Sequence, residues 1–191
     1  MKSTLITRTL LLTLTTQNTL AQEKTTDVLG RAIEYFQARK FHEALIIFCS
    51  LDKRYALNPR FKGYMGVCYY HDWDYSEACS ILDSIMSQLV VFAPQERSVY
   101  YYADAESHFF LRQYTEALPL YYTMLQLCHD NEKGDVFYRM GFCSLFLDNK
   151  EQALEYFKES KSYYQHFNAT NPNKARIAEL KHIIKGLERK I

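Results

Sequence analysis

The chain has 191 residues, and its 23 Lys and Arg are nearly balanced by 22 Asp and Glu, which gives a formal net charge of +1. A nucleic-acid-binding surface needs a basic stripe, and the interspersed charges here argue against one. Five single, widely spaced cysteines do not form a disulfide framework or a zinc motif of short spacing, so we expect buried free thiols.

The first 21 residues have the pattern of an export signal. Lys2 lies near the start, residues 9–16 are apolar or hydroxylic, and a small residue, Ala21, precedes Gln22. Cleavage after Ala21 would start the mature chain at Gln22. A disordered leader or a mitochondrial presequence is the alternative. No later stretch approaches the roughly 20 apolar residues of a membrane span, so we expect no integral membrane segment.

Helical periodicity dominates the rest of the chain. Apolar residues recur at i, i+3, i+4 and i+7 through residues 28–36, 44–51 and 78–89. Strict alternation bounded by turn residues, which would indicate strands, is missing from the sequence. Pro119 falls inside a predicted helix that starts near Tyr114, where we expect a slightly distorted first turn. These patterns predict an all-α fold.

One pattern recurs four times: a long or aromatic residue, two intervening residues, Ala, and a bulky residue four positions later. The alanines are 34, 39 and 36 residues apart. A period of this length with helical spacing inside each unit predicts a solenoid of helix pairs. The four segments are Phe41–Ala44, Tyr75–Ala78, Tyr114–Ala117 and Lys150–Ala153, and the bulky followers are Phe48, Leu82, Tyr121 and Phe157.

This pattern resembles the tetratricopeptide repeat, a family of stacked antiparallel helix pairs. In that family the first helix carries a small residue followed three positions later by Tyr. The corresponding pairs here are Ala32 and Tyr35, Gly66 and Tyr69, Ala105 and His108, and Gly141 and Ser144. The fourth unit departs most, with Ser144, Lys150 and Ser160 at places that are usually bulky.

The resemblance covers about residues 25–165 and implies an α-solenoid of about four helix pairs in a right-handed superhelix. Asp74 and Asn149 precede second helices and are expected to cap them. We expect a signal peptide at 1–21, a repeat domain at 22–165, and a loop with a capping helix at 166–191. The apolar stripe of that last helix is Ile177, Leu180, Ile184, Leu187 and Ile191; a detachable arm that docks on a partner is the alternative.

First helices line the concave surface in this family, and the resemblance therefore implies a binding groove. Such a lining would be aromatic and apolar with little charge, which suits an extended or helical peptide with hydrophobic anchors. A tight superhelix that buries these side chains against one another is the alternative. The candidate partner-binding residues are Phe36, Tyr70, His71, Tyr102, Phe109, Tyr138 and Phe142.

Two known uses of reactive or charged side chains are not expected. Chaperone-tail binding repeats clamp a carboxylate with Lys and Asn on first helices, whereas Leu29, Ile33, Gly63 and Val67 stand at those positions. The segments 71–74 and 128–130 contain His, Asp and Cys, but both fall at expected helix ends, where capping explains them. No phosphate loop, nucleophile elbow or spaced metal quartet appears. We expect no catalytic residue, no metal and no cofactor.

The sequence therefore predicts a non-catalytic scaffold or assembly adaptor that binds a peptide or partner protein. The leader places it in the periplasm or the cell envelope of a bacterium. Three alternatives remain: a cytosolic chaperone of the same repeat type for a secreted substrate, a regulatory subunit of an enzyme complex, or a homo-oligomer. The last would use exposed members of the 16 Tyr and 12 Phe.

Overall fold

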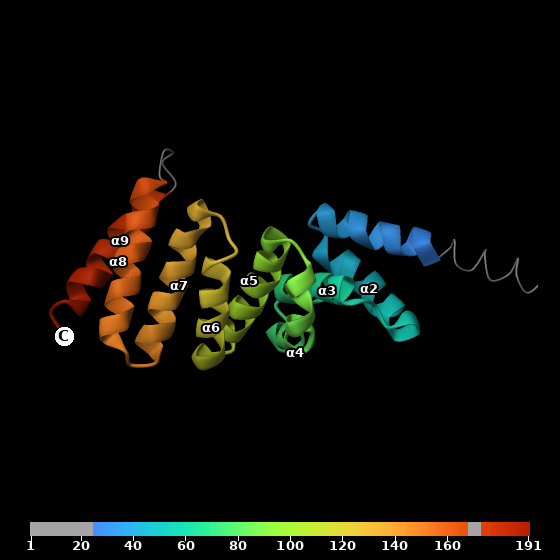
Figure 1. The fold of residues 1–191 in the computed structure, drawn as a ribbon, viewed down its shortest axis with the longest axis horizontal. Coiled ribbons are helices and arrows are strands. Elements are labelled where there is room, and N and C mark those ends of the chain that lie inside the picture. The colour runs from blue at the N-terminus through green and yellow to red at the C-terminus, as the bar shows by residue number, and fades with distance from the viewer. Residues whose placement is uncertain (1–24, 168–172) are drawn as a thin grey trace, which may run out of the picture. The chain divides into compact units, whose positions relative to one another are not determined.

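The computed structural model describes residues 25–167 and 173–191, and within them it is built of helices without strands. The all-α prediction is confirmed (Figure 1). A first helix, residues 25–37, is followed by eight more α-helices and two short 3₁₀-helices. Their bounds are α2 Phe41–Tyr55, α3 Pro59–His71, α4 Tyr75–Ile85, η1 Met86–Val91, α5 Pro94–Phe110, α6 Tyr114–Leu125, η2 Asp130–Glu132, α7 Lys133–Phe146, α8 Lys150–His166 and α9 Lys174–Leu187.

The chain divides into two compact units after Leu57. The first unit contains the helix at 25–37 and α2, and its repeat residues Ala32, Ala44 and Phe48 are fully buried. In the second unit each helix from α3 to α9 contacts the next one along the chain. The expected export signal at 1–21 lies outside the described residues.

Small residues let the two helices of a pair approach closely in the second unit. A Cβ atom at Gly66 of α3 would lie 2.5 Å from Cγ of Leu82 on α4. A Cβ at Gly141 of α7 would lie 2.6 Å from the ring of Phe157 on α8. Since real Cβ atoms do not come this close to carbon, only glycine fits at either place. The repeat register predicted from the sequence is confirmed at both pairs.

The same turn joins the two helices of every pair. One residue in each turn has a positive φ: 58° at Arg39, 63° at Trp73, 61° at Arg112 and 59° at Asp148. The next residue donates its backbone N–H to a carbonyl five positions earlier, as in a Schellman motif; the Asn149 bond to Ser144 O is 2.9 Å long. This closes the first helix and sets the start of the second.

Side-chain caps appear where the sequence predicts them. Oδ1 of Asp74 accepts a hydrogen bond from the backbone N–H of Glu77 at 3.3 Å, and Oδ1 of Asn149 accepts one from Gln152 at 3.1 Å. Each bond satisfies an N–H that has no partner inside the helix. α6 runs from Tyr114 to Leu125 as one helix with Pro119 inside it.

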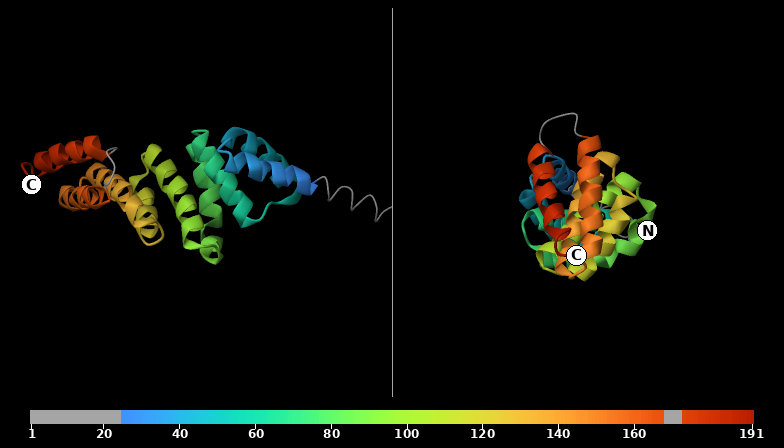
Figure 2. Two further views of the ribbon diagram at one scale, coloured as in Figure 1. Left: turned by 90° about the horizontal axis from the view of Figure 1, so that it is seen from above. Right: turned by 90° about the vertical axis from the view of Figure 1, so that its left-hand side faces the viewer.

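The C-terminal helix α9 covers the end of the last pair, lying alongside α8 (Figure 2). Leu180, Ile184 and Leu187 are buried in one cluster with Phe157 and Tyr164 of α8. This confirms the capping helix. The predicted stripe ends early, however, because α9 stops at Leu187 and the side chain of Ile191 is 56% exposed.

In the described part of the chain, no helix combines the length and the apolar character that a bilayer crossing requires.

Candidate functional site

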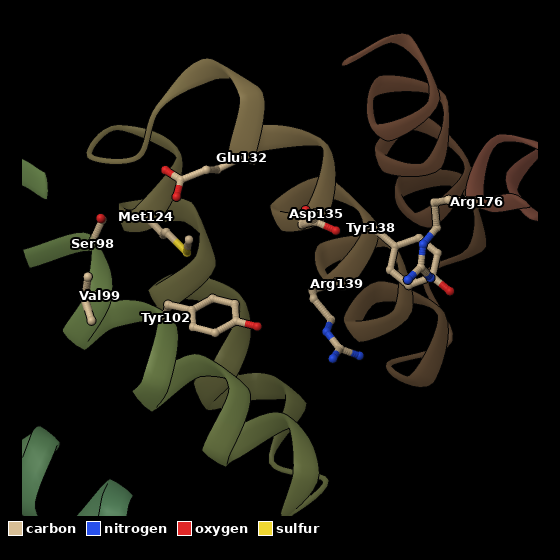
Figure 3. Close-up of a pocket in the computed structure, with 9 residues that line it drawn as sticks. All are labelled: Ser98, Val99, Tyr102, Met124, Glu132, Asp135, Tyr138, Arg139 and Arg176. Atoms are coloured by element: carbon tan, nitrogen blue, oxygen red, sulfur yellow. The ribbon is translucent and has the colours of Figure 1, made fainter. Parts of the chain in front are cut away.

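A cavity of about 550 Å³ lies between the first helices of two successive pairs, α5 and α7, in the second unit. The 3₁₀-helix η2 and the start of α9 complete its rim (Figure 3). Its volume falls in the range of ordinary ligand sites, large enough for one or two side chains of a partner. The lining residues are Ser98, Val99, Tyr102, Met124, Glu132, Asp135, Tyr138, Arg139 and Arg176.

The apolar wall comes from α5. Val99 is 47% exposed and Tyr102 is 36% exposed, three positions apart and therefore on one face of the helix. The ring of Tyr102 lies edge-on to that of Tyr70 on α3, with the centroids 5.9 Å apart. Burial, followed by the nearby carboxylate of Glu106, raises the pKa of Tyr102 above its ordinary value. The phenol therefore stays neutral and presents an O–H group to the cavity.

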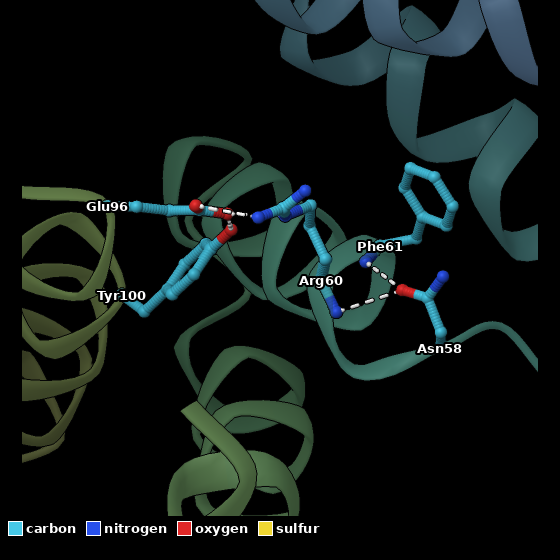
Figure 4. Close-up of polar contacts among 5 residues, drawn as sticks. All are labelled: Asn58, Arg60, Phe61, Glu96 and Tyr100. Atoms are coloured by element: carbon cyan, nitrogen blue, oxygen red, sulfur yellow. Dashed lines mark hydrogen bonds and ion pairs between the residues drawn. The ribbon is translucent and has the colours of Figure 1, made fainter. Parts of the chain in front are cut away.

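One ion pair from α3 ties down the start of α5, and a hydrogen bond within α5 orients its carboxylate. Arg60 makes a two-pronged ion pair with Glu96, with N–O distances of 2.8 and 3.1 Å, and Tyr100 donates its O–H to the same carboxylate at 2.9 Å (Figure 4). Asn58 caps the start of α3 beside this pair by accepting from the backbone N–H groups of Arg60 and Phe61. The wall of the cavity is thus held at the end of α5 that precedes Val99.

Arg139 supplies a fixed positive charge at the edge of the cavity. Its Nη2 donates to Oε2 of Glu106 at 2.6 Å, and Glu106 is only 1% exposed. The guanidinium also lies over the ring of Phe109, 4.8 Å from the centroid. Glu106 accepts a second bond from the hydroxyl of Tyr121 on α6. A guanidinium has five N–H donors, so Arg139 is held rigidly and can still bind an acceptor on a partner.

The opposite wall joins α7 to the capping helix. The Arg176 guanidinium lies 3.9 Å from the centroid of the Tyr138 ring. The Tyr138 hydroxyl donates to Oε1 of Glu179 at 2.7 Å. Asp135 accepts a hydrogen bond from the hydroxyl of Tyr164. Through Arg176 and Glu179, the start of α9 is part of the site as well as a cap.

The structure separates the predicted partner-binding residues into three groups. Tyr102 and Tyr138 line the cavity, and Tyr70 and Phe109 lie directly against its lining residues. Phe142 is partly buried; its ring lies edge-on to Tyr138 of the cavity wall and to Phe157 of the core, with centroids 4.9 and 5.1 Å apart.

The remaining two predicted residues lie away from the cavity lining. His71 is exposed at the end of α3, where its ring lies 4.9 Å from that of Tyr70. Phe36 belongs to the first unit, where its ring lies 5.7 Å from that of Phe41.

The prediction of a lining with little charge is wrong for this cavity. Arg139 and Arg176 line it together with two acids, Glu132 and Asp135. Three of the lining residues could have been grouped from the sequence alone, because positions 135, 138 and 139 share one face of a helix. Arg176 could not be found in this way, since its place depends on how the last helix docks.

In the first segment of reactive side chains the predicted capping role is seen at Asp74, and in the second the capping side chain belongs to a residue just beyond it. Asp74 caps α4, and Glu132 accepts a hydrogen bond from the backbone N–H of His129 at 2.8 Å. Both lie at helix ends.

The sequence matches no protein-family model and no curated protein. Solved structures of MamA, a tetratricopeptide-repeat protein, do match in fold. A MamA fragment from Desulfovibrio magneticus RS-1 has 17% identity and a TM-score of 0.59, and the match covers 87% of this chain and 96% of that one. A MamA mutant has 14% identity and a TM-score of 0.67, covering 87% and 82%. The chain has the tetratricopeptide-repeat fold. At this level of identity the likeness concerns the fold alone.

Proposed function

We propose that the protein is a non-catalytic scaffold or assembly adaptor that holds a segment of a partner protein in the cavity between α5 and α7. The observation that carries the proposal is the pairing of exposed apolar side chains, Val99 and Tyr102, with the fixed guanidinium of Arg139 in one cavity. Buried aromatic and arginine side chains are the usual energetic centres of protein interfaces.

The residues that line the cavity determine which kind of partner segment it can bind. Val99, Tyr102 and Met124 offer an apolar surface for one aliphatic or aromatic side chain. Arg139 and Arg176 are donors for backbone carbonyls or for a carboxylate near that anchor. The acids Glu132 and Asp135 on the same rim disfavour a strongly acidic segment. An extended or helical peptide with one bulky apolar anchor fits best.

The proposed setting is the bacterial periplasm or cell envelope. It rests on the export pattern of residues 1–21, which precede the described part of the chain. The mass of the mature protein tests this point. A chain that begins at Gln22 agrees with export, and a chain that retains Met1 would favour a cytosolic chaperone.

The binding test compares two exposed valines. Val99→Lys places a charge in the cavity, whereas Val90→Lys places it on η1, where Val90 is 66% exposed and does not line the cavity. Partners are identified by crosslinking in native cells and mass spectrometry, and their capture is then compared between variants of equal helical content. The proposal expects Val99→Lys to lower capture at least tenfold and Val90→Lys to leave it unchanged. Equal capture by both variants would contradict the proposal that the partner binds in this cavity.

A further inference from the structure

Three metal-ligating side chains, Cys79, Asp104 and His108, meet between α4 and α5, outside the cavity described above, and the carboxylate of Asp83 lies beside His108. Cys79 and Asp83 lie four positions apart on α4, and Asp104 and His108 lie four positions apart on α5, so each pair occupies one helix face. The two faces meet. The ligand atoms of Cys79, Asp104 and His108 all lie within 4.8 Å of one another. Nε2 of His108 is 3.5 Å from Oδ2 of Asp83 and 3.6 Å from Oδ1 of Asp104.

Asp104 is a buried acid that the protein itself pairs only weakly. Its side chain is 0% exposed, and neither carboxylate oxygen has a hydrogen-bond partner of normal geometry; the nearest groups are Nε2 of His108 at 3.6 Å and the Cys79 thiol. Burial of a carboxyl group without compensating bonds is costly, so a buried acid is normally paired or bound to a metal. One of its oxygens lies within 4.8 Å of the ligand atoms of Cys79 and His108. Such a weakly paired acid within a group of ligands points to a cation.

The imidazole of His108 is already oriented for coordination. Its Nδ1 lies 2.7 Å from the side-chain oxygen Oε1 of Gln113. An amide oxygen only accepts hydrogen bonds, so Nδ1 carries a proton, and in the neutral imidazole Nε2 then keeps its lone pair. Metal-binding histidines almost always donate their second ring N–H to an oxygen acceptor in this way. Gln113 acts here as a positioning residue.

We propose that Cys79, Asp83, Asp104 and His108 bind a divalent transition-metal ion of the zinc class. Thiolate and imidazole ligands favour Zn²⁺ over the hard cations Ca²⁺ and Mg²⁺, which prefer oxygen alone. Ligands at about 2.0–2.3 Å from zinc in a tetrahedron lie roughly 3.3–3.7 Å from each other. The two carboxylate-to-imidazole distances agree with that spacing. Cys79, Asp104 and His108 would supply three ligands, already within 4.8 Å of one another, and Asp83, 3.5 Å from His108, would supply the fourth.

Metal binding at this site must displace protons. In the metal-free protein, burial and the carboxylate of Asp83 raise the pKa of Asp104 to about 8. Burial, followed by the carboxylate of Asp104, raises the pKa of the Cys79 thiol to about 12. The ion binds the deprotonated forms of both, so affinity increases with pH. Asp83 is 58% exposed, so the group borders solvent at this residue.

The site would cross-link α4 to α5, the second helix of one pair to the first helix of the next. Because α5 also carries Val99 and Tyr102, the ion would stiffen one wall of the proposed binding cavity. The inference itself does not depend on the proposed function, since metal binding can be measured without a partner.

The test is a titration of the chelator-treated full chain with Co²⁺, a spectroscopic substitute for Zn²⁺. The proposal expects one equivalent of Co²⁺ with the visible bands of a tetrahedral ion and a near-ultraviolet sulfur-to-cobalt band, all lost when Zn²⁺ is added. Cys79→Ser should abolish the sulfur band. Asp83→Asn changes an exposed side chain, so the fold is retained, and affinity should fall about 10- to 100-fold.

Cys143→Ser is the matched control, because Cys143 is a buried thiol on α7 away from the group. It should leave the cobalt spectrum unchanged. Three results would overturn the proposal: no stoichiometric binding, a six-coordinate spectrum without a sulfur band, or a sulfur band that persists in Cys79→Ser.

Discussion

Leu82 occupies the space that any side chain at Gly66 would need. A Cβ at residue 66 would lie 2.5 Å from Cγ and 2.7 Å from Cδ2 of this leucine. Gly141 and Phe157 repeat the relationship two pairs later, at 2.6 Å. In these two pairs the bulky residue of the second helix thus packs onto the backbone of the first. This contact sets the distance between paired helices, and through it the positions of the side chains on α5 and α7.

Gly66→Ala should therefore destabilise the protein. The added methyl group forces Leu82 to move within a packed interface, which costs on the order of 1–3 kcal/mol of unfolding free energy. Gly186→Ala is the control, since a Cβ there meets nothing within 4 Å and the residue lies in α9. That change should raise stability by about 0.5–1 kcal/mol through helix propensity. Urea unfolding measures both. Equal effects of the two substitutions would contradict the packing argument.

Arg139 should matter for stability as well as for the cavity. Arg139→Met leaves the carboxylate of Glu106, which is 1% exposed, without its ion-pair partner. Loss of one partner from a buried pair costs about 3–5 kcal/mol. Adding Glu106→Gln removes the buried charge and should restore most of the loss, because an amide can still accept from Tyr121. A double-mutant cycle from chemical unfolding measures the coupling, and additive effects would contradict it.

Asp104 should make the metal-free protein less stable as the pH rises. Its pKa is about 8 in the folded state against about 3.9 in an unfolded chain, with Cys79 and Asp83 of α4 and His108 of α5 facing it. Between these values the folded state holds a proton that the unfolded chain has lost. Unfolding free energy therefore falls from about pH 4 to pH 8, by at most about 1.4 kcal/mol per pH unit, and levels off above.

Asp104→Asn is the comparison for this titration. It removes the ionisable group at nearly constant size, so the contribution of this residue to the slope should vanish. Unfolding curves in the presence of a chelator, recorded across that pH range, give the difference. The same slope in both proteins would show that Asp104 is not the group responsible.

The capping role of α9 predicts unequal effects along its apolar stripe. Leu180 is 0% exposed among residues of α7 and α8, so Leu180→Ala should cost about 2–5 kcal/mol. Ile191 lies beyond the helix and is 56% exposed, so Ile191→Ala should change stability by less than about 0.5 kcal/mol. Thermal or urea unfolding distinguishes them. A mild effect of Leu180→Ala would instead favour a detachable arm.

Sequence reasoning succeeded where local chemistry decides the structure. The spacing of Gly66 and Leu82 gave the helix pairing, because a solenoid repeats one contact at each unit. Asp74 and Asn149 were predictable as caps, since capping depends on residues only three positions away.

Sequence reasoning was less informative where a contact joins segments that are distant in the chain. Phe142 was assigned to the groove by register, and its side chain is partly buried between Tyr138 of the cavity wall and Phe157 of the core. Arg176 reaches the cavity only because α9 docks beside α7 and α8, which no local pattern reports. The sequence did not suggest the proposed metal ligands of α4 and α5 for a related reason. Each helix carries two of them at helical spacing, and the short spacings of a metal motif do not occur.

The proposal that the α5–α7 cavity holds a partner segment is tested most directly by site-specific photo-crosslinking in native cells. A photoreactive amino acid replaces Tyr102 in one protein and Tyr122, a 47% exposed tyrosine of the second helix α6, in another. The account predicts a crosslink from position 102 to one segment of a partner, centred on a bulky apolar residue, and no such product from position 122. Crosslinks to the same partner from both positions, or from position 122 alone, would contradict it.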